Sequence, residues 1–132
     1  PVPGGGRRSG GAGGGLAAVA VSGNNAARKS GHCLLEAKDG IWVIDHGLTF
    51  QVDQKLRTVI WEFSGEALPG DLCGDIERAL IAVEKGGLGE TLAELLRPAE
   101  VRMLKRRLRG VLDPAWRFPE PTSAWSIPWP PV

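Results

Sequence analysis

In the second half of the chain, apolar side chains recur every three or four residues, which is the spacing of one face of an α-helix. The first such stripe should end at Gly86 and Gly87, and it consists of Leu72, Ile76, Ala79, Leu80 and Val83. A short second helix is expected around 90–96, and a third should begin at Pro98, a favourable first-turn residue. The apolar face of the third consists of Val101, Leu104, Leu108 and Val111. The pattern therefore predicts three helices within residues 67–112.

A different pattern precedes these helices. Two short β-prone runs, 33–36 and 41–45, lie on either side of a polar segment that ends in Gly40. Short β-prone runs joined by a turn with glycine are typical of a β-hairpin. We therefore expect the start of the first run to lie beside the end of the second.

The predicted hairpin brings His32, just before the first strand, next to Asp45, at the end of the second. A neutral imidazole and a carboxylate can share a divalent cation, so this pair is a candidate metal site. Gly47 should let the backbone turn sharply after Asp45. His46 could be a further ligand, but adjacent side chains on extended backbone point apart, which favours a surface or packing role.

The N-terminal region contains little to bury. Residues 1–15 include eight glycines and should form a disordered arm. The run Leu16–Val21 fits either a helix or a strand, and its composition leaves both open. If it is a strand, the next residues are similar to the phosphate-binding P-loop G-x-x-x-x-G-K-S/T. Arg28 replaces the second glycine of that motif, and its side chain would block the phosphates, which argues against a P-loop.

The segment after Pro114 combines prolines with large rings, those of Trp116, Phe118, Trp125 and Trp129. Such rings favour burial and proline favours extended backbone, so we expect a strap packed across the helices. Trp42 and Trp61 are also expected in the core. An alternative for residues 128–131 is a ligand of a proline-recognition domain.

The third predicted helix carries a basic stripe opposite its apolar face, formed by Arg102, Lys105, Arg106 and Arg109. A solvated helix face explains such a stripe. The alternative is a contact with phosphate groups on a lipid or a partner.

Composition limits the function classes. The chain has 132 residues, 42% of them hydrophobic, which suffices for one domain with a modest core. Its 16 basic and 15 acidic residues give a net charge of +1, so no general attraction to nucleic acid or membrane is expected. No apolar run reaches the length of a transmembrane helix. Cys33 and Cys73 lack metal-ligand spacing, and we expect two reduced thiols in the cytoplasm.

The loop Asn24–His32 reads N-N-A-A-R-K-S-G-H, and Ile44–Gly47 reads I-D-H-G. In these motifs the chain resembles the phosphatidylinositol 3- and 4-kinase-like proteins of actinobacteria, whose loop reads N-N-A-D-R-K-x-G-H. The resemblance continues at 48–50, 55–61 and 65–66, and resumes at 98–101, 118–121 and 127–131. Several motifs in matching order are more specific than any one of them alone.

The resemblance implies an α+β fold, the C-terminal lobe of a kinase-like protein over residues 16–132. It implies ATP-dependent phosphoryl transfer with Mg²⁺ as cofactor. His32 and Asp45 would bind the metal, and Asp45 takes the position of the aspartate in the kinase D-F-G triplet. Arg28 and Lys29 would lie near phosphate, and without nucleotide they would be ordinary solvated charges.

Two departures from the family pattern change this expectation. Ala27 occupies the position of the catalytic aspartate, so the group that orients and deprotonates the acceptor hydroxyl is absent. No N-lobe can be recognised in the 26 residues before it, so an N-lobe or a partner protein would have to supply the nucleotide clamp. We therefore expect a truncated or degenerate kinase-like protein that is inactive alone. The alternative is a non-catalytic interaction module that keeps the fold.

Overall fold

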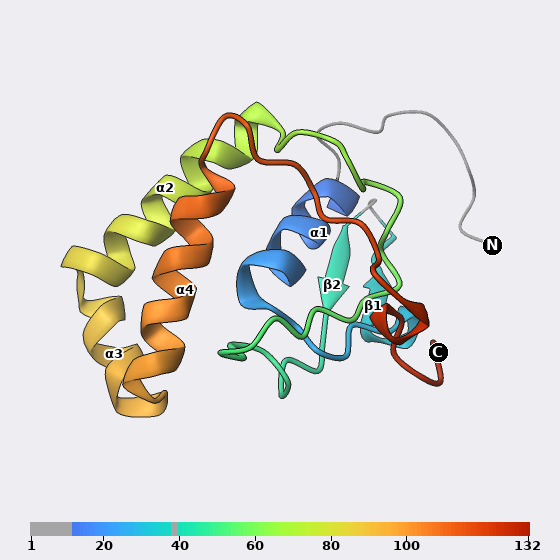
Figure 1. The fold of residues 1–132 in the computed structure, drawn as a ribbon, viewed down its shortest axis with the longest axis horizontal. Helices are drawn as coiled ribbons and strands as arrows, with labels where there is room; N and C mark the ends of the chain where they lie inside the picture. Colours follow the sequence, from blue (N-terminus) through green and yellow to red (C-terminus); the bar gives the residue numbers. More distant parts are fainter. Residues whose placement is uncertain (1–11, 38–39) are drawn as a thin grey trace.

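In the computed structural model, helices pack on one side of the molecule, and a small sheet and the C-terminal tail lie on the other (Figure 1). The structure describes residues 12–37 and 40–132, which contain four α-helices and one sheet of two antiparallel strands. The α+β prediction is thus confirmed at this level. Within the described ranges, no helix is both long enough and apolar enough to cross a membrane.

Helix α1 (Ala12–Gly23) lies between the other helices and the sheet. The run at 16–21, which could have been a helix or a strand, is therefore helical, and the P-loop alternative is excluded because that motif follows a strand. Ala17, Ala18 and Ala20 are buried, and their small side chains let α1 pack closely on its neighbours. The predicted disordered arm falls mostly on residues 1–11, outside the described ranges. Its boundary at residue 15 is wrong, because α1 already begins at Ala12.

The three helices predicted in the second half are confirmed as α2 (Gly70–Lys85), α3 (Gly87–Leu95) and α4 (Pro98–Val111). All four residues of the predicted apolar face of α4 are buried. Glycine is required in the turn between α2 and α3. A Cβ atom at Gly86 would lie 2.9 Å from the carbonyl oxygen of Ala82, and one at Gly89 would clash with the carbonyl of Val83.

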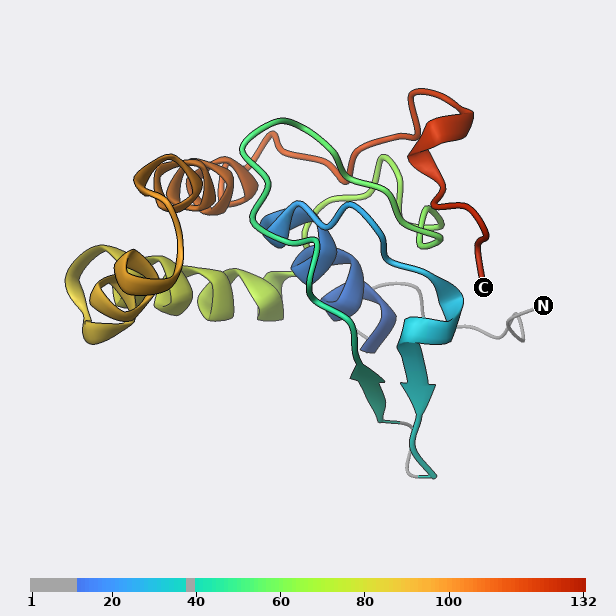
Figure 2. The same ribbon diagram turned by 90° about the horizontal axis from the view of Figure 1, so that it is seen from below.

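Strands β1 (Cys33–Leu35) and β2 (Ile41–Val43) confirm the predicted hairpin, which extends away from the helices (Figure 2). Leu34 pairs with Trp42 across the strands. Trp42 is 64% exposed, so its predicted place in the core is wrong. No second layer covers this face of the sheet within the described residues, and the indole nitrogen instead donates to Glu36 over 3.2 Å.

Two clusters of buried side chains form the core, and Trp116 packs against both. The larger joins α2 and α4, and its buried members are Ile76, Val83, Val101, Leu104, Leu108 and Val111. The smaller consists of Ala17 and Ala18 of α1 and Phe118 of the tail. The rings of Trp116 and Phe118 meet edge to face with centroids 4.9 Å apart. The tail therefore connects the helical side to α1, as a strap would.

Farther along, the tail runs over the loops rather than the helices and passes through the short 3₁₀ turn η2 (Ala124–Ser126). The backbone of Thr58 donates to the carbonyl of Ser126, and that of Ser30 donates to the carbonyl of Pro131. Trp125 and Trp129 are 76% and 87% exposed, so the prediction that they are buried is wrong. Backbone hydrogen bonds, not these two rings, hold the end of the chain against the loop that follows α1.

Candidate active site

The loop that carries the site begins at a tightly closed helix end. Asn24 has a positive φ of 50° directly after α1. Its N–H donates to the carbonyl of Val21 over 3.0 Å, and the N–H of Asn25 donates to that of Ala20 over 3.0 Å. This pair of bonds is a Schellman motif, in which asparagine is one of the few residues that replaces glycine. The motif fixes the direction in which the loop leaves α1.

The fully buried Asn24 side chain anchors the loop to the segment after the hairpin. Its Nδ2 donates to the carbonyls of Gln51, over 3.0 Å, and Asp53, over 2.6 Å. Its Oδ1 accepts from the N–H of Lys55 over 3.1 Å. Because the amide uses donors and acceptor together, an apolar or acidic side chain would leave buried backbone groups unpaired.

Ala27 lies at the bend of this loop. Its N–H donates to Oδ1 of Asn25 over 2.8 Å, an Asx turn that sets the backbone conformation. The loop is also bonded to Arg57, whose N–H donates to the carbonyl of Asn25 and whose carbonyl accepts from Arg28, each over 2.9 Å. These bonds fix the backbone at position 27, but the methyl group of Ala27 can neither accept a proton nor orient a hydroxyl.

Arg28 lies in the interior, with 1% of its surface exposed. Its Nη1 donates to the carbonyl of Ile44 over 2.6 Å, and its Nη2 donates to Nδ1 of His46 over 3.1 Å. The expectation of a solvated Arg28 is wrong, because the buried guanidinium binds the backbone of Ile44 and the side chain of His46, the two neighbours of Asp45. Burial lowers the pKa of Arg28, and the nearby charges of Cys33 and Asp45 offset part of this effect. Burial likewise raises the pKa of the Cys33 thiol, against the effect of Arg28.

His32 and Asp45 meet at the rim of the hairpin, as the sequence predicted. Nε2 of His32 lies 3.3 Å from Oδ2 of Asp45. The carboxylate side chain is 58% exposed and the imidazole 18% exposed, so the pair is open to solvent on the aspartate side. Nδ1 of His32 accepts a long hydrogen bond of 3.4 Å from the N–H of Lys29, so the proton of the neutral ring lies on Nε2. Binding of a cation at Nε2 would require that proton to move to Nδ1, at the expense of the Lys29 bond.

The sharp turn after β2 is made by Asp45 itself, with a φ of 57°. Aspartate tolerates the left-handed region, and Arg28 holds both of its neighbours. Gly47 lies in the turn that follows, in which the N–H of Thr49 donates to the carbonyl of His46, but Gly47 itself has no positive φ. His46 has the predicted packing role. It accepts from Arg28 at Nδ1 and donates from Nε2 to the carbonyl of Val43 over 3.2 Å.

Other metal ligands are not gathered around the pair. Within residues 12–37 and 40–132, no three His, Cys, Asp or Glu side chains come close enough to hold one ion. Cys33 and Cys73 are both free thiols, as expected. A cation at His32 and Asp45 would therefore take its remaining ligands from water or a bound molecule.

The structure adds one site-supporting residue that the sequence reasoning missed. Arg107 of α4 donates from Nε to the carbonyl of Ser22, near the end of α1, over 2.9 Å. Its Nη1 donates over 3.0 Å to the carbonyl of Gln51, which also accepts from Asn24. Arg107 lies three residues after Leu104 and four before Val111, beside the apolar face rather than within the basic stripe. That position was the signal that it is partly buried.

Comparison with known proteins adds little about activity. No family model and no solved structure match the chain. The chain is 38% identical over 108 residues to Protein Rv2133c of Mycobacterium tuberculosis strain H37Rv. The matched region is 81% of this chain and 38% of that protein. The chain thus spans well under half of the length of this relative, whose name states no activity.

Proposed function

We propose that the chain is the C-terminal lobe of a phosphatidylinositol 3- and 4-kinase-like phosphotransferase, with His32 and Asp45 as its metal-binding pair. The observation that carries the proposal is the 3.3 Å separation of these two side chains at the hairpin rim. They come from two motifs on either side of the hairpin, which stand in the order of the family pattern. The loop Asn24–His32 is held between α1 and the segment after the hairpin, where a phosphoryl-transfer loop would be needed.

The donor set fits a divalent cation that accepts both nitrogen and oxygen. The nearest side-chain atoms of His32 and Asp45 are 3.3 Å apart, so both could approach one cation. An imidazole suits Mn²⁺ better than Mg²⁺, which prefers oxygen. His32 and Asp45 would hold such an ion, and it would supply positive charge for a bound phosphate. Arg28 would act indirectly by holding the turn at Asp45, which leaves Lys29 as the proposed direct phosphate contact.

Mn²⁺ binding tests this site. Mn²⁺ should broaden the NMR signals of residues 31–33 and 44–46 at lower concentrations than those of any other segment. Asp45→Asn should weaken the effect at least about tenfold, because it removes the only charged ligand. Asp53→Asn is the matched control, since Asp53 is an exposed aspartate of a nearby loop, and it should change nothing. Broadening that survives Asp45→Asn would rule out the proposed pair.

The same proposal predicts that the 132-residue chain transfers no phosphoryl group from ATP. A general base contributes about 10² to 10⁴-fold to such a reaction, and Ala27 supplies none. Within the described residues, β1 and β2 form the only sheet, so strands that could cover a nucleotide are absent from this part of the chain. Ala27→Asp alone should therefore stay inactive, whereas Ala27→Asp joined to an N-lobe from a related kinase should transfer radiolabelled phosphate. Transfer by the unaltered chain that Asp45→Ala abolishes would overturn this prediction.

A second candidate function is a non-catalytic interaction module. Two features favour it, the alanine at position 27 and the apolar side chains of Leu35 and Trp42, which are 82% and 64% exposed on the hairpin. The two functions differ in one measurable property. A phosphotransferase lobe paired with its N-lobe should bind nucleotide only when metal is present, and an interaction module should not respond to metal.

A further inference from the structure

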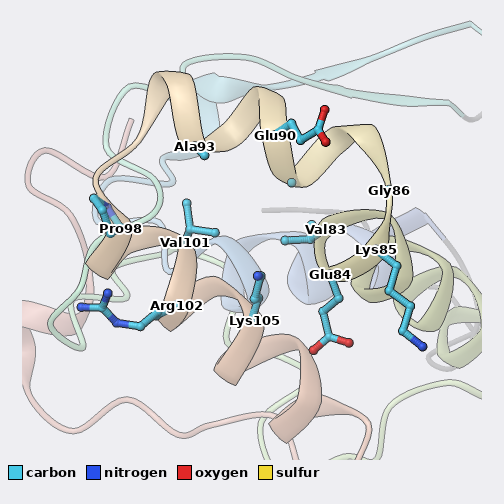
Figure 3. A pocket seen from close by; sticks show the side chains of 11 residues that line it. Val83, Glu84, Lys85, Gly86, Glu90, Ala93, Pro98, Val101, Arg102 and Lys105 are labelled. Carbon is cyan, nitrogen blue, oxygen red and sulfur yellow. The ribbon is translucent and has the colours of Figure 1, made fainter.

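A hollow of about 470 Å³ lies between α4 and the turn that joins α2 to α3 (Figure 3). The helices that line it, α2, α3 and α4, lie on the other side of the molecule from strands β1 and β2 (Figure 1). Its volume lies within the range of small-molecule sites, about 300 to 1,000 Å³. Apolar side chains of Val83, Ala93 and Val101 line it, so a ligand would find an apolar surface as well as charges.

The charges around the hollow are unevenly paired. Lys105 points toward the space between the helices, while Lys85 and Arg102 extend from its edges (Figure 3). Among the ion pairs of the described residues, none includes Lys85, Arg102 or Lys105. Of the two acidic side chains that line the hollow, Glu84 is already paired with Arg109. Among the described residues, the lining thus contains three basic residues that form no ion pair and one unpaired carboxylate, that of Glu90.

We propose that this hollow binds an organic phosphate, with the phosphate at Lys105 and Arg102 and an apolar body on Val83, Ala93 and Val101. A half-buried lysine without a carboxylate partner is the group that a phosphate oxygen would pair with. The Glu90 carboxylate repels a bound anion, so removal of its charge should strengthen phosphate binding. The phosphate can belong to a soluble molecule or to a lipid headgroup.

The soluble source is tested by NMR titration of the full chain with inorganic phosphate and phenyl phosphate. Both should shift the amide signals of residues 83–90 and 98–105, and phenyl phosphate should bind several-fold more tightly because its ring covers apolar surface. The lipid source is tested with phosphatidylcholine vesicles with and without phosphatidic acid. Binding of phenyl phosphate supports a soluble ligand, and binding only to vesicles with phosphatidic acid supports a headgroup.

Three matched variants decide whether the hollow is responsible for that binding. Lys105→Ala should weaken binding of the phosphate probe about tenfold, since it removes a charge-assisted hydrogen bond. Arg106→Ala removes the same charge from an exposed neighbour that does not line the hollow, and it should have no effect. Glu90→Gln should strengthen binding about twofold. The proposal is overturned if no probe binds at millimolar concentration, if Lys105→Ala and Arg106→Ala weaken binding equally, or if Glu90→Gln weakens it.

Discussion

Phe118→Ala should lower the free energy of unfolding by about 3 to 5 kcal/mol, the usual cost of removing a buried aromatic ring. Phe118 is 4% exposed and packs on Ala17 and Ala18 of α1 and on the rings of Phe63 and Trp116. The α1 residues beneath the ring are alanines, which cannot extend into the space that it would leave. The backbone of Phe118 also exchanges hydrogen bonds with Glu66 and Gly65, so a cavity there would loosen the whole strap. Urea denaturation followed by tryptophan fluorescence measures the loss.

Trp129→Ala is the matched control for this experiment. It removes a larger ring from the same tail, but the ring is 87% exposed, and the expected change is below about 0.5 kcal/mol. If the two variants lost equal stability, the tail would be held by general hydrophobic contact rather than by the packing of Phe118 on α1.

Arg28→Ala should cost about 3 kcal/mol or more, because it removes a buried guanidinium together with its two hydrogen bonds and leaves a cavity in its place. The carbonyl of Ile44 and Nδ1 of His46 would both lose their donor. Asp45 would then be free to leave its left-handed conformation, so Mn²⁺ binding at the hairpin rim should weaken in the same variant. Thermal unfolding and Mn²⁺ titration measure the two effects.

Arg57→Ala serves as the control, since Arg57 is exposed and joins the loop only through its backbone. It should change stability by no more than about 0.5 kcal/mol. Arg28→Lys adds a further test, because a lysine ammonium lacks the planar fork that reaches two acceptors at once. Full stability in Arg28→Lys would show that charge alone, without the two-point contact, holds the turn.

The sequence was a good guide wherever one local pattern decided the structure. The stripes on α2 and α4 predicted helices, because each buries one continuous face against the other. The hairpin followed from two short runs and a turn, and its pairing brings His32 and Asp45 to the same end of the two strands. The candidate metal pair was therefore predictable without knowledge of the remaining fold.

Local pattern was a poor guide wherever burial depended on a distant segment. Trp42 and Trp129 are as apolar as Phe118, yet only Phe118 meets another layer, that of α1. Arginine is usually exposed, and Arg28 is buried because the Ile44–His46 turn folds over it. The run at 16–21 was equally compatible with helix and strand until α4 packed beside it.

The sequence by itself determined the helices of the second half and the hairpin, because hydrophobic periodicity and turn residues are patterns within a few neighbouring positions. It also determined the chemical limit at position 27, since alanine has no group that could take a proton. Only the tertiary structure decided which polar groups support the site. Asn24, Arg28 and Arg107 reach carbonyl groups that lie 16 to 85 residues away in the chain. Such bonds form only when the fold brings those carbonyls into a buried place where they need a donor.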